Sequence, residues 1–241
     1  MDVLDERQIA ANGFQKPLHL DRVKLLDMVT RVLPSAFFLL VVLQKINDLY
    51  GFVMKGYASG NEPAWRFAAD LVSRTSTICV LGLLSVLFLI RLEPIRKAKG
   101  ILPRAMAIAG TFFVALVTFF PRANLSMTQT VIASLLCLVG TGISVFVLAH
   151  LGRSFSLMAE ARRLVTTGPY RILRHPLYLF EGVASFGVLL QFLSFYTVVI
   201  FIGFGLIQFQ RMKNEEEILE KAFPEYQDYK LKTARLIPGI Y

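Results

Sequence analysis

The chain has 241 residues, of which 55% are hydrophobic and only 18% are charged, and its mean hydropathy is +0.56. Ordinary soluble domains carry about a quarter charged residues, so this composition argues against a soluble enzyme with one large core. The apolar majority excludes an intrinsically disordered chain, and 16 glycines, 10 prolines and 2 cysteines exclude collagen-like and disulfide-stapled classes. The composition predicts an all-α, polytopic integral membrane protein.

Residues 1–33 precede the first apolar run and are expected to form a cytoplasmic or interfacial segment. Asp2, Asp5 and Glu6 stand near its start, and no short apolar core follows a basic start, so this is not the pattern of a cleavable signal. Between Leu18 and Val29 apolar residues alternate with charged ones. This spacing predicts an amphipathic helix that lies in the membrane interface.

Six apolar segments follow in chain order. They cover residues 34–50, 71–92, 104–120, 127–150, 177–192 and 195–209. A membrane-crossing helix needs about 20 apolar residues, so the second and fourth segments are long enough, and the first and third are marginal. Residues 177–209 would form a helix of roughly 50 Å, which is too long for one straight span. The sequence QFLS at 191–194 therefore predicts a break and a tight helical hairpin.

These segments divide the chain into three parts. Residues 34–150 are expected to hold four transmembrane helices, and residues 151–241 a catalytic region made of the hairpin and a cytosolic tail. The fold is thus expected to be a bundle of about five to six transmembrane helices. Residues 51–70 contain three glycines and a proline and are expected to form the longest external loop.

The net charge of +9 is distributed between the apolar segments rather than in one patch, which favours the membrane surface over nucleic acid as a partner. Basic residues gather before the first segment, after the second, after the fourth and after the sixth. The remaining ones are Lys45, Lys55, Arg66, Arg74 and Arg122. With six crossings, the four basic clusters fall on one side of the membrane. The positive-inside rule then predicts that both termini are cytoplasmic.

Residues 164–181, with the sequence LVTTGPYRILRHPLYLFE, combine a turn, several basic residues and the start of the fifth segment. Pro176 suits the first turn of a helix, where its missing N–H costs nothing. Free backbone N–H groups at that helix start, beside Arg174 and His175, favour an anion. The same features also fit a basic loop that anchors a helix to lipid headgroups. The residues alone leave both interpretations open.

The stretch 208–241 is rich in charge and is expected to continue the sixth helix into the cytosol. Gln208, Arg211 and Glu215 share one helix face, and Arg211 is expected to pair with Glu215. Three consecutive carboxylates, at 215–217, usually mark a solvated helix face, but here they follow a membrane exit directly. A carboxylate in this position can accept hydrogen bonds from the vicinal hydroxyls of a ribose.

Two motifs in these stretches carry a family resemblance. Gly168-Pro169-Tyr170, followed by Arg174-His175-Pro176 and Tyr178, is similar to the pattern G-P-Y-x-x-x-R-H-P-x-Y. Arg211, followed by Glu215-Glu216, Leu219, Phe223, Tyr226, Tyr229, Arg235 and Pro238, is similar to R-x-x-x-E-E-x-x-L…Y-x-x-Y…R-x-x-P. Together, over residues 147–241, they resemble the isoprenylcysteine carboxyl methyltransferase family, which is related to the phospholipid N-methyltransferases.

The resemblance implies methyl transfer from S-adenosylmethionine to a lipidic or prenylated acceptor that enters from the bilayer, at the cytoplasmic interface and without a metal. Glu215 and Glu216 would hold the ribose or amino group of the cofactor, and Arg211 would orient that pair. Arg174 would hold a carboxylate of the acceptor or the cofactor. The implied cofactor-binding residues are Gly168, Pro169, Tyr170, His175, Pro176, Tyr178, Glu215, Glu216, Tyr226 and Tyr229. The implied catalytic residues are Arg174, Glu181 and Arg211.

Two positions depart from the family pattern. Phe180 and Pro224 stand where the family commonly has a small residue, often glycine. A bulky Phe180 would fill part of the acceptor tunnel and narrow the substrate range. Glu181 follows within an apolar helix, where a carboxylate is costly and so indicates function. Its expected partners are Arg174 or Arg211, and the alternative is that it reaches back to the interface.

Three functions stay open on the sequence. The first is transfer of a methyl group to the carboxylate of an isoprenylcysteine-like or isoprenoid compound, with a phospholipid amine as a related acceptor. The second is a membrane reductase of the sterol-reductase type that uses NADPH, because the C-terminal tail of such reductases is similar to the tail of this chain. The third is a membrane scaffold without catalytic activity, which leaves the placement of His175 and Glu181 unexplained.

Overall fold

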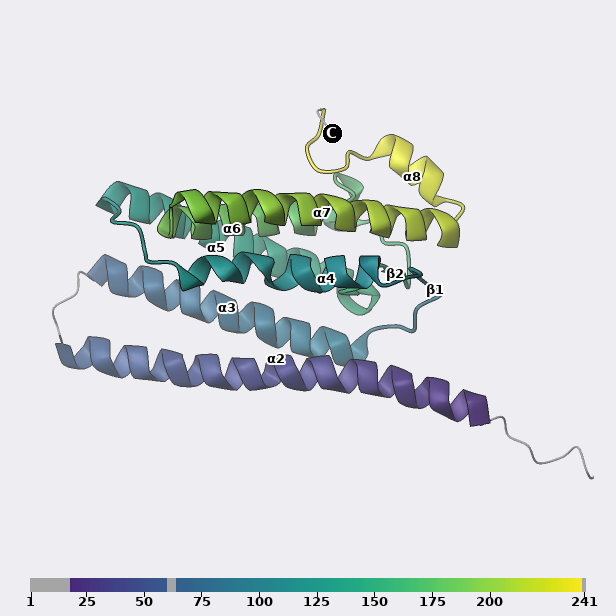
Figure 1. Ribbon diagram of the computed structural model, residues 1–241, viewed down its shortest axis with the longest axis horizontal. Coiled ribbons are helices and arrows are strands. Elements are labelled where there is room, and N and C mark those ends of the chain that lie inside the picture. The colour runs from purple at the N-terminus through teal and green to yellow at the C-terminus, as the bar shows by residue number, and fades with distance from the viewer. Residues whose placement is uncertain (1–17, 60–63, 240–241) are drawn as a thin grey trace, which may run out of the picture.

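A computed structural model describes residues 18–59 and 64–239 as a bundle of helices (Figure 1). Five described helices are long and apolar enough to cross a membrane, and they cover Met28–Gly56, Asp70–Ile90, Leu102–Phe119, Met127–Ser154 and Phe195–Ala222. A sixth apolar helix, Pro176–Gln191, is shorter. The predicted all-α membrane bundle of about five to six spans is therefore confirmed.

The first two helices, α2 (Leu18–Ser59) and α3 (Ala64–Ile90), form a long pair along one side of the bundle (Figure 1). Residues 18–33 are the first turns of α2 and run without a break into the first span, so the helix predicted at 18–29 is not a separate element. The rest of the segment 1–33, residues 1–17, lies outside the described residues.

The prediction of an external loop over residues 51–70 is wrong, because α2 extends to Ser59 and α3 begins at Ala64. Gly56 lies within α2 and allows close packing against α3, so it does not mark a turn. Phe67 lies against Gly56, where an added Cβ would meet its ring at 2.5 Å, and the Phe67 ring stacks on Phe52 at 5.1 Å. The residues between the two helices, 60–63, lie outside the described part.

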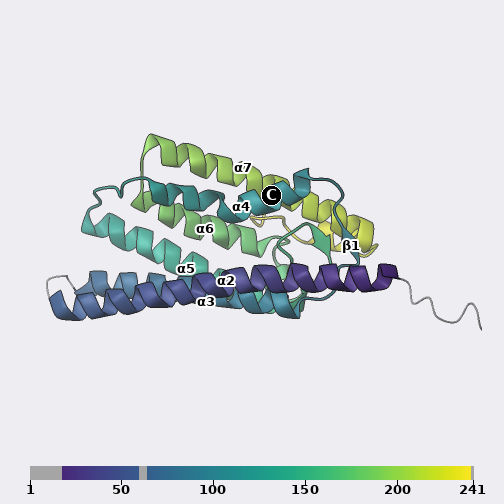
Figure 2. The same ribbon diagram turned by 60° about the horizontal axis from the view of Figure 1, so that its bottom comes forward.

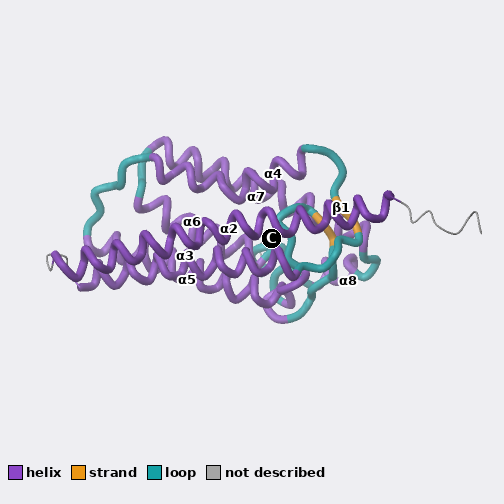
Figure 3. The backbone as a smooth tube through the Cα atoms, turned by 90° about the horizontal axis from the view of Figure 1, so that it is seen from below, coloured by secondary structure: helices purple, strands orange, loops and turns teal. Residues whose placement is uncertain are grey.

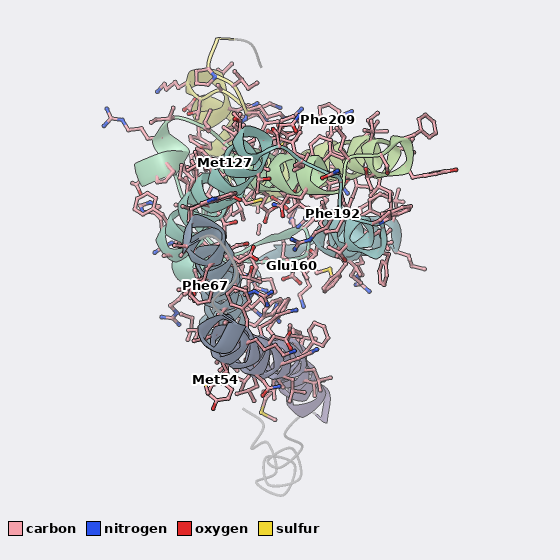
Figure 4. The ribbon with its side chains drawn as sticks, turned by 90° about the vertical axis from the view of Figure 1, so that its left-hand side faces the viewer. Met54, Phe67, Met127, Glu160, Phe192 and Phe209 are labelled. Carbon is pink, nitrogen blue, oxygen red and sulfur yellow. The ribbon has the colours of Figure 1, made fainter. Side chains whose placement is uncertain are left out.

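The third and fourth spans begin at recognisable signals. Helix α4 (Leu102–Phe112) has a proline in its first turn and tightens into the 3-10 helix η1 (Phe113–Phe119). Helix α5 (Met127–Leu151) begins at a capping box made by Ser126 and Gln129. Seen end on, α2, α3 and α5 form one group of helices and α4 and α7 another, with Glu160 in the angle between them (Figure 4).

The break predicted at 191–194 is confirmed, since α6 (Pro176–Gln191) ends there and α7 (Phe195–Ala222) begins at the Ser194–Thr197 capping box. The two helices do not form a tightly packed hairpin, however. Helix α6 contacts mainly α5, and α7 contacts mainly α4 (Figure 2). The close approach of α5 and α6 depends on Gly140 and Gly187, where an added Cβ would lie 2.5 Å from the Ala184 nitrogen and 2.7 Å from the Ala133 oxygen.

The short elements gather at one end of the bundle (Figure 3). Strands β1 (Arg96–Lys97) and β2 (Glu160–Ala161) pair antiparallel there, near the 3-10 helices η2 (Gly152–Ser154) and η3 (Gly168–Arg171) and helix α8 (Tyr226–Lys232). The C-terminal tail closes this end, because the backbone N–H groups of Arg174 and His175 donate to the carbonyls of Ala234 and Arg235 at 2.8 and 3.1 Å. The loop before α6 is thereby tied to the end of the chain.

Candidate active site

A cavity of about 430 Å³ lies between the helices, within the usual range of small-molecule sites. Its polar part lies near the end where α8 and the loops gather. Nine of the residues singled out from the sequence line it, namely Tyr170, Arg174, His175, Tyr178, Glu181, Arg211, Glu215, Tyr226 and Tyr229. Its apolar part is lined by residues such as Phe38, Leu81, Leu84, Val114, Leu148 and Phe204. The two motifs therefore meet at one cavity that also has an apolar extension.

Among the residues implied as catalytic or cofactor-binding, four do not line the cavity: Gly168, Pro169, Pro176 and Glu216. Gly168 has a φ of +57° and lies so close to the ring of His150 that an added Cβ would be 2.4 Å from it. The adjacent Tyr170 stacks on the same His150 ring at 6.5 Å. Pro176 occupies the first turn of α6, as predicted. These residues shape the turn that presents Tyr170, Arg174 and His175.

Glu216 is the centre of a buried polar network. Its Oε1 atom accepts hydrogen bonds from Arg174 Nε at 2.9 Å and Arg235 Nε at 3.0 Å, and lies 3.1 Å from His175 Nε2. The other oxygen accepts from the Arg235 guanidinium. Only 3% of Glu216 is exposed. Because protein donors occupy both oxygens, the geometry gives Glu216 the task of holding Arg174 and His175 rather than a cofactor.

Arg174 is fixed from two further directions. Its NH1 group donates to the carbonyl oxygens of Lys230 and Thr233, each at 2.7 Å. The network thus joins the start of α6, the end of α7 and the tail after α8. Sequence reasoning placed Arg235 in the second motif but gave it no role, although a guanidinium is the usual partner of a buried carboxylate.

Glu215, the neighbouring residue on α7, lines the cavity. The Tyr178 hydroxyl donates a hydrogen bond to its Oε1 atom. The Arg211 guanidinium lies over the Tyr178 ring, 5.0 Å from the centroid. The shared helix face predicted for Gln208, Arg211 and Glu215 is confirmed. Arg211 donates to Gln208, and both Arg211 and Glu215 contact Tyr178. Tyr178 is thus one of the α6 residues that contact this face.

The expected ion pair between Arg211 and Glu215 is wrong for the described residues, as is direct pairing of Glu181 with either arginine. Arg211 NH1 donates to Gln208 Oε1 at 2.8 Å, and Gln208 Nε2 donates to Glu181 Oε2 at 3.0 Å. Gln208 therefore stands between the two charges and links them. An amide can do this because it is both donor and acceptor, and its side chain is buried at this position.

Three tyrosines close the polar end of the cavity. The Tyr229 hydroxyl donates to the Tyr170 carbonyl at 2.6 Å, and the Tyr226 and Tyr229 rings meet edge to face at 5.7 Å. Burial raises the pKa of Tyr229 to about 12 and also raises the pKa values of Tyr170 and Tyr226. All three hydroxyls therefore stay protonated at neutral pH. The Tyr226 hydroxyl lies among buried groups for which the described structure offers no hydrogen-bond partner, which leaves it able to bind a ligand.

Sequence reasoning missed two serines that line the cavity, Ser144 in α5 and Ser154 in η2. Both hydroxyls are buried, and neither has a hydrogen-bond partner among the described residues. A serine in an apolar helix is a weak signal in one sequence, so the structure was needed to find them. Within residues 18–59 and 64–239, no group of three or more His, Cys, Asp or Glu side chains is placed to hold a metal ion.

Comparison with known proteins concerns the same part of the chain. Over 83 residues it is 31% identical to the nickel-cobalt-cadmium resistance protein NccN of Alcaligenes xylosoxydans xylosoxydans, across 34% of this chain and 38% of that protein. Over 99 residues it is 34% identical to the cobalt-zinc-cadmium resistance protein CzcN of Cupriavidus metallidurans, across 39% of this chain and 45% of that protein. The match thus spans less than half the length of either relative.

A family profile gives the more specific result, and it confirms the resemblance carried by the two motifs. The matched residues run from the start of α5 to the first residue of α8 and include the whole of α6 and α7. Residues 128–226 of this chain match the model of the phospholipid methyltransferase family, the family that includes the isoprenylcysteine carboxyl methyltransferases.

Proposed function

We propose that the chain is an integral membrane methyltransferase that transfers a methyl group from S-adenosylmethionine to a lipidic acceptor. The observation that carries this proposal is one cavity with two kinds of wall, polar beside α8 and apolar between the membrane helices. A nucleoside cofactor fits the first and an apolar tail fits the second. The reacting atoms then meet near Tyr178 and Glu181.

The polar end offers what S-adenosylmethionine needs. The Glu215 carboxylate is able to accept hydrogen bonds from the ribose hydroxyls, and the Tyr226 hydroxyl is a free donor or acceptor. The Tyr178 ring and the Glu181 carboxylate give the sulfonium an electron-rich surrounding. Arg174 and Arg211 supply the positive charge that a carboxylate of the cofactor or the acceptor needs.

The reaction demands alignment more than acid–base chemistry. The bond from sulfur to the methyl carbon breaks as the bond from that carbon to the acceptor forms, and the sulfonium becomes a neutral thioether. Positioning the two molecules in line supplies much of the rate acceleration. A carboxylate acceptor is already ionised at pH 7 and needs no base, so the carboxylate of an isoprenylcysteine-like or isoprenoid compound remains our first candidate acceptor.

A phospholipid amine is the second candidate acceptor. Glu181 favours it, because a carboxylate beside the reaction point attracts an ammonium group and can take a proton from it, which frees the nitrogen lone pair for attack on the methyl carbon. Both acceptors share the apolar tail. We further propose that both termini and the polar end of the cavity face the cytoplasm. The basic clusters after the second, fourth and sixth apolar segments support this orientation.

The test is equilibrium binding of tritiated S-adenosylmethionine to the purified full chain, with NADPH titrated in parallel. We expect saturable binding of the first compound, weakened about tenfold or more in Glu215→Gln because a hydrogen bond to a charged group is lost. The control is Glu217→Gln, since Glu217 is exposed and pairs only with Lys221 on its own helix among the described contacts. Saturable binding of NADPH alone would contradict the proposal and favour the reductase.

A further inference from the structure

We infer that Ser144 is an acceptor-binding residue that holds the polar head of the lipid by a hydrogen bond at the point of methyl transfer. This inference rests on the proposed function. The acceptor it implies is a lipid with a hydrogen-bonding oxygen or nitrogen atom beside the reacting atom, because a purely hydrocarbon end would leave the serine hydroxyl unbound.

The first observation is that the Ser144 hydroxyl is buried without a partner. Only 5% of Ser144 is exposed, and its Oγ atom has no hydrogen-bond partner among the described residues. A buried hydroxyl without a partner costs about 1–3 kcal/mol on the scale of protein mutational data, so such a group calls for an explanation. Ser144 also lines the cavity, so a bound molecule is within its reach.

The second observation is the height of Ser144 in the bundle. Gly140 of α5 lies against Phe180 and Ala184 of α6, and Gly187 lies against Ala133, so the two helices run antiparallel. Ser144 follows Gly140 by one turn. It therefore lies level with the first turns of α6, where Tyr178 and Glu181 stand, rather than deep in the membrane.

Ser144 also lies at the border between the two parts of the cavity. On the same face of α5, Leu148 belongs to an apolar cluster with Phe38, Leu87 and Phe88. On the facing helices are Tyr178, Glu181 and Arg211, all of which line the cavity. A lipid whose tail occupies the apolar part must place its head at this border, where the methyl group arrives.

The chain offers a matched control on another wall of the same cavity. Thr111 of α4 also lines it, but its hydroxyl already donates to the Ala107 carbonyl at 2.8 Å. The substitution Thr111→Val removes this hydroxyl. Because its proton is already donated within α4, a bound lipid loses no hydrogen-bond donor. Ser144→Ala removes the unbound hydroxyl, and Ser144→Thr restores one.

The experiment measures methyl transfer by the full chain from tritiated S-adenosylmethionine to phosphatidylcholine vesicles that carry either N-acetyl-S-farnesylcysteine or phosphatidylethanolamine. For whichever lipid is methylated, we expect Ser144→Ala to raise the KM of the lipid about 3- to 10-fold, the worth of one neutral hydrogen bond. The KM should stay unchanged in Thr111→Val and return toward the original value in Ser144→Thr. The affinity for S-adenosylmethionine should stay the same in all three variants.

Each other outcome has a clear meaning. An unchanged KM in Ser144→Ala, or a KM that Ser144→Thr does not restore, would overturn the inference while leaving the proposed function intact. A loss of S-adenosylmethionine affinity in Ser144→Ala would assign the hydroxyl to the cofactor and overturn the inference as well. Methylation of neither lipid by a chain that binds S-adenosylmethionine would overturn the proposed acceptors, and the inference with them.

Discussion

The pair α2–α3 and the region from α6 to α8 are built on opposite distributions of polar groups. In α2 the large apolar side chains point outward, as with Leu40 at 67% and Leu33 at 64% exposed, and ring stacking and a glycine contact join its end to α3. In the second region Arg211, Glu216 and His175 are buried. His175 bonds to Glu216, and Arg211 donates to Gln208 on its own helix and to the carbonyl of Leu157.

The difference separates anchoring from chemistry. Apolar side chains that face lipid gain nothing from exact placement, and a membrane helix of that kind tolerates change as long as it stays apolar. Buried charges are tolerated only where each has a partner, so the second region is bound to one geometry. A substitution in the polar region should therefore alter the site, whereas one in α2–α3 away from the cavity should alter only stability.

Glu216→Gln should have the largest effect, because it leaves the partly buried guanidinium groups of Arg174 and Arg235 without their shared anion. Removing one partner of a buried ion pair costs about 3–5 kcal/mol. We expect a large loss of thermal stability in detergent together with loss of S-adenosylmethionine binding. The adjacent Glu217→Gln is the control and should change the free energy of unfolding by about 0.5 kcal/mol or less. Equal effects of the two substitutions would refute the buried network.

Gly168→Ala should come next. Its φ of +57° disfavours any side chain, and the added Cβ would meet the His150 ring at 2.4 Å, for a cost of about 1–3 kcal/mol. Because the turn carries Tyr170, we also expect weaker S-adenosylmethionine binding.

The counterpart in the other region is Gly56→Ala, whose Cβ would meet the Phe67 ring at 2.5 Å. It should lower thermal stability but leave the binding constant unchanged. A drop in affinity for S-adenosylmethionine in Gly56→Ala would show that the two regions are not independent and would break the comparison.

The sequence was sufficient for features that depend on composition along the chain. Apolar runs located the spans, and QFLS located the break before α7, because a capping serine and a length limit act locally. It failed at residues 51–70, where glycine and proline were read as turn signals. Gly51 and Gly56 are both helical, and at Gly56 tertiary packing against Phe67 of α3 outweighs the low helix propensity of glycine.

In the site, the sequence pointed to Glu215 and Glu216 together but could not divide the work between these two carboxylates. Glu215 and Glu216 are one residue apart and so point about 100° apart around α7. Which one faces the cavity depends on where α6 and the tail lie, and the position of Arg235 is a long-range property of the fold. The same holds for Gln208, whose bridging place between Arg211 and Glu181 no spacing rule predicts.

Tyr229→Phe should have the smallest effect and tests how finely the polar region is tuned. It removes the hydrogen bond to the Tyr170 carbonyl, so we expect a loss of about 1 kcal/mol in the free energy of unfolding near pH 7. The ordinary pKa of tyrosine is 10.0, and burial raises the pKa of Tyr229 to about 12. Between these pH values the unfolded chain binds fewer protons at this site than the folded one.

The free energy of unfolding therefore falls as the pH rises through this window. Thermal unfolding of the original chain and of Tyr229→Phe should be compared at pH 8 and again above pH 10. The gap between them should narrow at the higher pH, because phenylalanine has no proton to lose in the unfolded state. A gap that stays constant would mean that the Tyr229 hydroxyl is not buried against Tyr170, and the tyrosines would then not close the polar end of the cavity.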